Sequence, residues 1–220
     1  MAGDGRGVLE NIGGAFQILW ALLTPFLRWR RVRWGATTAE WERRWPGDDL
    51  VAAPRWQCLH AIDVAAPPEE VWPWVAQIGQ GRGGFYSFER LENLVGCRIR
   101  NSNRILPEHQ DLGAVEGIKL AAKAPPMPLA VVEPGRGFVL HGRGDMGGAE
   151  KGPDGATTWG VFVEPNGRGG SRVLSRQRAV WGGGLAAALM FGPWVLEPIS
   201  FVMDRKMLKG IKLRAEAARG

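Results

Sequence analysis

The sequence is poor in the side chains from which most catalytic and metal sites are built. Its 220 residues include two cysteines, three histidines and one tyrosine. Two cysteines exclude a disulfide scaffold and a cysteine-rich zinc cluster. No G-x-S-x-G nucleophile motif occurs, and neither Cys58 nor Cys97 has a neighbouring partner that marks it as a nucleophile. We therefore expect no metal ion and no cofactor.

In place of these residues the chain holds 11 tryptophans and 32 glycines. The hydrophobic share of 45% and the charged share of 23% are those of an ordinary globular protein, which excludes wholesale disorder. The length fits one medium domain with appendages. Such a domain can bury a sizeable core without disulfides.

Positive charge is concentrated at two places along the chain. Residues 28–44 hold six arginines against two glutamates, and residues 204–220 hold six lysines and arginines against two acids. The remaining residues carry 18 acids against 16 bases, so the body of the chain is slightly acidic. This pattern argues against a nucleic-acid partner and indicates two cationic patches.

An uncharged apolar segment, residues 11–27, precedes the first cationic patch. As a helix it would be roughly 25 Å long, at the lower limit for crossing a bilayer. Arginines and tryptophans follow it, and both favour an anionic membrane interface. Three alternatives stay open: a transmembrane helix, an amphipathic helix lying on the membrane, and a helix docked on the domain. We expect the cytoplasmic side of the cell membrane as the location.

The residues expected to face that membrane are the large apolar and basic side chains around the junction: Phe16, Leu19, Trp20, Leu23, Phe26, Arg28, Trp29, Arg30 and Arg31.

The second cationic patch also follows an apolar run. Residues 185–203 are long enough to span a membrane, but they contain Gly192, Pro193, Glu197 and Pro198. Two prolines five residues apart break or kink a helix. We therefore expect a C-terminal helix over about 185–217, kinked near both prolines and packed on a sheet.

The middle of the chain alternates between helix and strand patterns. Thr37 and Glu40 form a capping box for a helix over 38–45, and alternating apolar residues predict a strand over 57–65. A second helix begins at Pro67-Pro68. The G-x-G-x-x-G spacing of residues 79–84 lacks the preceding strand of a dinucleotide site, so it is interpreted as a loop before a helix over 85–95.

From residue 97 onward the pattern turns to strands. Residues 133–137 and 165–170 are turn sequences, each between two apolar runs. The order predicts an α+β fold in which a curved antiparallel sheet wraps around a long C-terminal helix and leaves an apolar cavity. The expected parts are an anchor over 1–33, a short helix and linker over 34–55, and the domain over 56–220.

Four segments carry a resemblance to a known family: WGAT (34–37), APPEEVWPWVAQIGQGRGGFYSFERLENLVG (66–96), IRNSNRILPEHQDL (99–112) and EPISFVMDRKMLKGIK (197–212). Together they resemble the bacterial polyketide cyclase/dehydrase-like (SRPBCC) proteins of the START-like helix-grip superfamily. The resemblance covers roughly residues 34–212. It implies a deep apolar cavity that holds lipids, isoprenoids, polyketides or other hydrophobic molecules. It brings no settled catalytic motif.

The candidate site residues follow from their place in these elements. His60 and His141 lie on predicted strands and are candidate acid–base groups, although a strand histidine is commonly a satisfied core residue. Polar loop residues could line the mouth of the cavity, or they could only form hydrogen bonds that hold the loop to the sheet. The candidate ligand-binding residues are Trp74, Tyr86, Phe88, Asn101, Arg104, Gln110, His141, Trp159 and Arg176.

These observations favour a monomeric binding protein that holds a hydrophobic small molecule or lipid at the membrane. One alternative is a cyclase or dehydratase acting on a polyketide-like or isoprenoid substrate, which requires a histidine and a carboxylate in the cavity. Another alternative is a membrane-associated scaffold with a filled core and no ligand.

Overall fold

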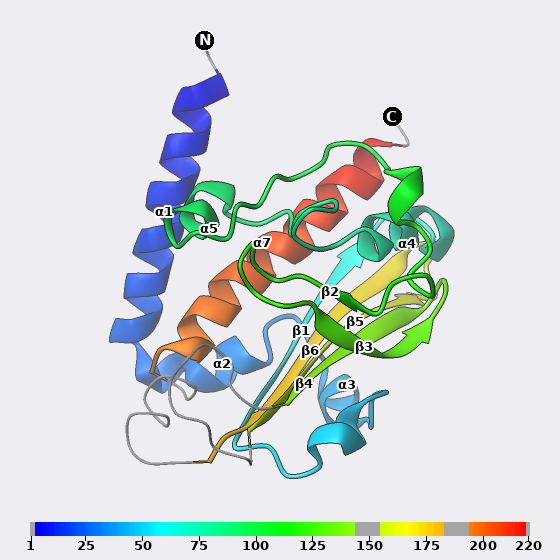
Figure 1. Cartoon of the computed structure of the whole chain (residues 1–220). Coiled ribbons are helices and arrows are strands. Elements are labelled where there is room, and N and C mark those ends of the chain that lie inside the picture. Colours follow the sequence, from blue (N-terminus) through cyan, green and yellow to red (C-terminus); the bar gives the residue numbers. More distant parts are fainter. Residues whose placement is uncertain (1–2, 144–154, 183–193, 219–220) are drawn as a thin grey trace.

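The computed structural model describes residues 3–143, 155–182 and 194–218, with side chains from residue 11 onward. These residues form a six-stranded antiparallel sheet in the order β1-β6-β5-β4-β3-β2 (Figure 1). The fold is of the α+β class, as the sequence predicts. The strands are β1 (Trp56–Val64), β2 (Gly117–Ile118), β3 (Met127–Glu133), β4 (Gly137–Arg143), β5 (Ala156–Pro165) and β6 (Ser171–Val180).

Two hairpins form where turn residues interrupt apolar runs, as predicted. β3 and β4 meet at a tight turn in which Glu133 pairs with Gly137. The loop between β5 and β6 is closed by Asn166, whose Oδ1 accepts hydrogen bonds from two backbone N–H groups of the loop. Such side-chain bonds let asparagine mimic a backbone turn. In the first hairpin Gly135 takes a φ of 79° instead, which glycine adopts readily, so turn residues located both hairpins.

The long helix α7 (Leu196–Ala217) packs across one face of the sheet, which we call the inner face (Figure 1). Gly210 permits close packing, because a Cβ there would collide with the Tyr86 backbone carbonyl. Residues 185–193, including the kink predicted at Pro193, lie outside the described residues. Pro198 lies in the first turn of α7, where backbone N–H groups have no intrahelical partner. A proline at this position costs the helix no hydrogen bond, so the kink predicted near Pro198 is not found.

Short helices connect these elements. The capping box is confirmed, because the Thr37 side chain accepts from the Glu40 N–H while Glu40 accepts from the Thr37 N–H. The bounds are α1 (Gly3–Leu23), η1 (Pro25–Leu27), α2 (Arg28–Val32), α3 (Thr38–Glu42), η2 (Asp48–Val51), α4 (Pro68–Ala76), α5 (Glu89–Leu94) and η3 (Pro107–His109).

Helix α5 is shorter than the helix predicted over 85–95. Tyr86 has a φ of 55°, which no right-handed helix accommodates. The backbone N–H groups of Phe85 and Tyr86 donate instead to Asn101 Oδ1, at 3.1 and 2.7 Å. Asn101 therefore holds a turn from a distance of 15 residues along the chain, which no local pattern shows.

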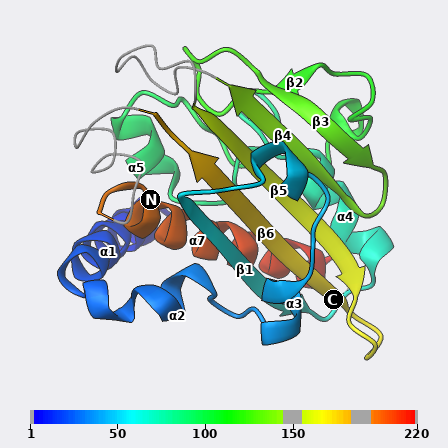
Figure 2. The same cartoon turned by 90° about the horizontal axis from the view of Figure 1, so that it is seen from below.

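The outer face of the sheet is covered by the segment from α3 through η2 (Figure 2). Trp45 packs there against Leu59, Val139 and Phe162. The side chains of β4 alternate between the faces, since Phe138 and Leu140 belong to the core on the inner face and Val139 to the outer one. Both faces of the sheet are thus buried.

Helix α1 docks on α5 and α7 (Figure 1) with its small residues inward. A Cβ on Gly14 would lie 2.8 Å from the Phe88 ring, and Ala21 is buried. The large side chains of α1 point the other way. Ile12, Phe16, Leu19, Trp20 and Leu23, which we call the α1 apolar stripe, are 52–67% exposed. Within the described part of the chain, no helix is both long and apolar enough to span a bilayer.

Candidate functional site

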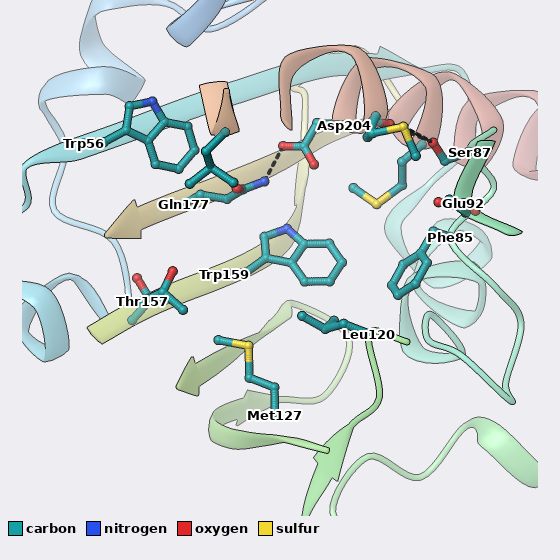
Figure 3. Close-up of a pocket in the computed structure, with 14 residues that line it drawn as sticks. Trp56, Phe85, Ser87, Glu92, Leu120, Met127, Thr157, Trp159, Gln177 and Asp204 are labelled. Carbon is teal, nitrogen blue, oxygen red and sulfur yellow. Dashed lines mark hydrogen bonds between the residues drawn. The ribbon is translucent and has the colours of Figure 1, made fainter. Parts of the chain in front are cut away.

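A pocket of about 240 Å³ lies between the inner face of the sheet and α7. Figure 3 shows Trp159 in its middle, with Asp204 on one side and Leu120 and Met127 on the other. Its walls are mainly apolar and include Phe85, Leu120, Met127, Trp159, Met203 and Met207. The polar lining residues include Ser87, Glu92, Gln177 and Asp204. An apolar cavity with a few convergent polar groups is typical of a small-molecule site.

Trp159 on β5 is held in one orientation by its neighbours. Its ring centroid lies 5.9 Å from that of Phe85 and 6.2 Å from that of Phe138. Its indole Nε1 donates a hydrogen bond to Ser175 Oγ at 3.0 Å. The indole face is therefore a preorganised apolar surface for a ligand.

Asp204 projects from α7 to the wall of the pocket. Its Oδ2 accepts hydrogen bonds from Ser175 Oγ at 2.8 Å and Gln177 Nε2 at 2.9 Å, and lies 2.9 Å from His60 Nδ1. Asp204 is 5% exposed and His60 is fully buried. This ion pair joins β1 and β6 to α7 and so fixes one wall of the pocket.

Both ring nitrogens of His60 face acceptors, because Nε2 lies 3.0 Å from the Arg31 carbonyl oxygen. Burial alone would lower the pKa of His60, but the neighbouring Cys58 and Asp204 offset it, and the pKa is raised. The raised pKa and the two acceptors favour the imidazolium form, which can donate a proton to each of them.

Cys58, His60 and Asp204 also place three metal-ligating atoms within 4.8 Å of one another. A metal ion would displace the proton between His60 and Asp204, while Nε2 would keep its bond to a backbone carbonyl, as ligating histidines commonly do. Burial raises the pKa of the Cys58 thiol, which opposes the thiolate that a metal requires.

Glu92 on α5 is the second acid of the pocket. It is 8% exposed, and its Oε2 has no hydrogen-bond partner in the described part of the chain. Burial, with a smaller contribution from Glu89, raises the pKa of Glu92 to about 7. A carboxyl group that titrates near neutral pH can exchange a proton or receive a cation.

Of the nine predicted ligand-binding residues, Trp159 lines the pocket. Trp74 and Tyr86 are instead packed in the core, where the Tyr86 hydroxyl donates to the Trp74 carbonyl at 2.9 Å. Phe88 is covered by α1. Helical spacing shows that a side chain is buried but not whether it borders a cavity, so the sequence could not separate these core residues from residues of the pocket wall.

The polar loop residues hold the loop together. Asn101 binds the turn at residues 85–86, and Gln110 Nε2 donates to the Pro73 and Leu106 carbonyls. Arg104 is exposed at the surface, while its backbone carbonyl accepts from Gln77. Asn101 and Gln110 therefore hold the loop in place, but their bonds reach the turn at residues 85–86, α4 and the loop itself rather than the sheet.

Arg176 and His141 both lie on the outer face of the sheet, away from the pocket. Arg176 lies on the outer face, where its Nε is 3.1 Å from Asp48 Oδ1. His141 shares the outer side of β4 with Val139, as the strand alternation requires. His60 contacts Asp204 but does not itself line the pocket, and neither of the other two histidines lines it. The histidine-based acid–base mechanism therefore has no support in the described residues.

The sequence analysis missed Phe85, Glu92 and Asp204. Asp204 could have been found, because it lies three residues before Met207 and four before Leu208 on the buried side of α7. An acid on an apolar helical stripe indicates a buried partner. Glu92 had no such signal, since α5 spans fewer than two turns.

The predicted membrane-facing residues divide in two. The apolar ones are exposed: Phe26 by 78% and Trp29 by 62%, beside the α1 apolar stripe. Arg30 is also exposed. Arg31 is buried, however, and donates to the Thr24 carbonyl at 2.6 Å, so it does not face a membrane. Arg28 is 45% exposed at its side chain and pairs with buried Glu197 at 2.5 Å.

An open groove of about 470 Å³ lies next to these exposed residues. It is lined by Phe26, Arg28, Trp29, Val32, Trp41, Pro54, Arg55, Trp56 and Gln57. Trp56 also lines the inner pocket, so one side chain borders both spaces.

No protein-family model matches the chain, and no curated protein matches it. Among solved structures, the chain is similar to the crystal structure of protein MLL2253 from Mesorhizobium loti. The two share 16% identity over 68% of this chain and 98% of the other, with a TM-score of 0.34. A likeness at this level carries no argument about function.

Proposed function

We propose that this protein binds a hydrophobic small molecule or lipid in the pocket between the sheet and α7, and that it does so at a membrane surface. The observation that carries the proposal is the largely apolar pocket around Trp159. Its volume of about 240 Å³ equals that of about eight water molecules in the liquid, enough for a compact ligand. We further propose that the fold is a helix-grip fold of the polyketide cyclase/dehydrase-like type.

The α1 apolar stripe supports the membrane location. A helix docked on a soluble domain normally buries its large apolar residues, whereas α1 buries glycine and alanine and exposes phenylalanine, leucine and tryptophan. Exposed Arg30 and Trp29 follow the stripe, and these side chains suit an anionic membrane interface. Trp56 separates the pocket from the groove that lies beside this surface.

A second function, catalysis by a cyclase or dehydratase, is favoured by the position of Glu92, a buried carboxyl group on the pocket wall whose Oε2 has no partner among the described residues. Glu92 has a pKa raised to about 7, which suits a general acid or base at neutral pH. The role assigned to a histidine in the sequence analysis would then fall to this carboxyl group.

Native mass spectrometry of the full-length protein tests the binding function. We expect the purified protein to carry an additional non-covalent mass that denaturing conditions remove. Uniformly bare protein, together with no binding of short-chain amphiphiles, would favour a ligand-free scaffold instead.

Vesicle flotation tests the membrane location. We expect the protein to float with phosphatidylcholine vesicles that contain phosphatidylglycerol, and Phe16→Asp to abolish flotation. Leu213→Asp is the matched control, because Leu213 is 66% exposed on α7 and lies outside the stripe. Equal flotation of both variants would contradict the assigned surface.

A further inference from the structure

The protein balances the charge of one pocket acid and leaves the other unbalanced. Asp204 receives hydrogen bonds from Ser175 and Gln177 and pairs with His60. Glu92 is 8% exposed, and its Oε2 has no partner in the described residues. Buried carboxylates are normally paired, because removing their charge from water is costly. The lack of a hydrogen-bond partner for Glu92 Oε2 among the described residues therefore calls for an explanation.

Among the described residues, no positively charged group is found to influence Glu92. The titratable groups that influence it or that it influences are Glu89 and Cys97, an acid and a thiol. No cation pairs with Glu92 among the described residues, although arginine–carboxylate pairs are frequent elsewhere in the structure. A cation at this end of the pocket would have to come with the ligand.

The aromatic walls suit the same kind of ligand. Phe85 and Trp159 line the pocket with Glu92, and Figure 3 shows Glu92 beside Phe85. Aromatic faces attract cations, most strongly where water is excluded. A carboxyl group and two aromatic rings thus favour an ammonium group over a carboxylate, while Leu120 and Met127 favour an apolar body.

We propose that the pocket takes a compact amphiphilic amine, whose ammonium group pairs with Glu92 and whose apolar body packs on Trp159, Leu120 and Met127. This inference rests on the proposed binding function and names the ligand class of the same pocket. The His60–Asp204 pair keeps Asp204 occupied, so Glu92 is the residue that selects the charge of the ligand.

Isothermal titration calorimetry of the full chain with three eight-carbon probes tests this inference. The probes are octylamine, 1-octanol and octanoate at pH 8, the two charged probes below their micellar concentrations and 1-octanol below its solubility limit. For the wild type we expect octylamine to bind at least tenfold more tightly than 1-octanol, and octanoate most weakly. In Glu92→Gln the advantage of octylamine disappears, while the affinity for 1-octanol changes less than twofold.

Glu69→Gln is the matched control, because it removes one negative charge from an exposed residue of α4. We expect it to keep the wild-type preference. If Glu92→Gln does not fold, Glu92→Met, which removes the same charge, takes its place in the experiment. If octylamine binds no more tightly than 1-octanol to the wild type, or keeps its advantage in the Glu92 variant, the proposed amine ligand is wrong. If 1-octanol still binds in that case, the proposed binding function of the pocket stands. Failure of all three probes overturns both.

Discussion

Both faces of the sheet bury charged side chains, but the two faces differ in whether each buried charged residue has a counter-ion among the described residues. On the outer face, Asp48 pairs with Arg176 and Arg178 at 3.1 and 3.2 Å, and Arg178 Nε also donates to the Val51 carbonyl. On the inner face, the pair of His60 and Asp204 is equally well supported, yet a pocket and an unpaired acid lie next to it.

This difference separates charge that maintains the fold from charge that is available to a ligand. On the outer face Asp48 is the counter-ion of both arginines, and Gln57 and two backbone carbonyls accept further hydrogen bonds from them, although Arg176 Nη1 has no partner among the described residues. The inner face pairs one acid internally and leaves Glu92 exposed to the pocket alone. Burial of a charged residue is therefore not by itself a sign of a binding site, whereas an unpaired buried charge beside a cavity is.

The largest expected effect comes from breaking the outer face. Asp48→Asn leaves Arg176 and Arg178 buried without a counter-ion, and we expect the free energy of unfolding to fall by about 4 kcal/mol. Urea unfolding followed by circular dichroism measures this loss. Asp49→Asn, at an exposed neighbouring position, should change it little. Equal stability of the two variants would mean that the outer arginines do not depend on Asp48.

Breaking the inner pair should cost somewhat less. Asp204→Ala leaves His60 without its carboxylate, but His60 can lose its proton and become neutral, so we expect a loss of about 3 kcal/mol. The chemical shifts of His60 in a pH titration should then show a pKa below that of the wild type. An unchanged pKa would contradict the role of Asp204 as its counter-ion.

Glu92 should make stability depend on pH in the opposite direction from a paired acid. Its folded pKa of about 7 lies above the ordinary value of 4.5, so the folded state binds more protons between these values. The free energy of unfolding therefore falls as the pH rises through this window, by about 2.5 kcal/mol between pH 5 and pH 8. Glu92→Gln should remove this decline when both proteins are unfolded with urea at pH 5 and pH 8. A parallel decline in both would exclude Glu92 as its source.

Filling the pocket should have the smallest effect on stability and a large effect on binding. Leu120→Phe adds apolar volume at the wall, and we expect the free energy of unfolding to change by about 1 kcal/mol or less. Affinity for 1-octanol should fall at least tenfold, measured by calorimetry. Unchanged affinity in a folded variant would place the ligand elsewhere.

Local patterns predicted much of the fold. The strand expected over 57–65 is β1 (Trp56–Val64), and the capping box at Thr37 is present. These features depend on alternation, spacing and turn chemistry among near neighbours. The helix expected over 85–95 was too long because Asn101 captures its first turn, an interaction that the local sequence does not contain.

The candidate site was harder to predict because its contacts join distant residues. His60 meets Asp204 across 144 residues, and Arg176 meets Asp48 across 128. Strand alternation correctly grouped His60 with Cys58 on one face, but it could not say which face would carry the pocket. Trp159 was found because a large aromatic on a strand must border some interior space.

The sequence by itself determined the order of strands and helices, the two cationic patches and the apolar character of residues 11–27, since these depend on composition and short-range periodicity. Only the tertiary structure decided that α1 turns its large side chains outward, that Arg31 and Arg176 are buried with partners, and that Glu92 Oε2 has no partner among the residues that the structure describes. Pairing and burial are set by which surfaces meet when the sheet and α7 pack, and that geometry is a property of the whole chain.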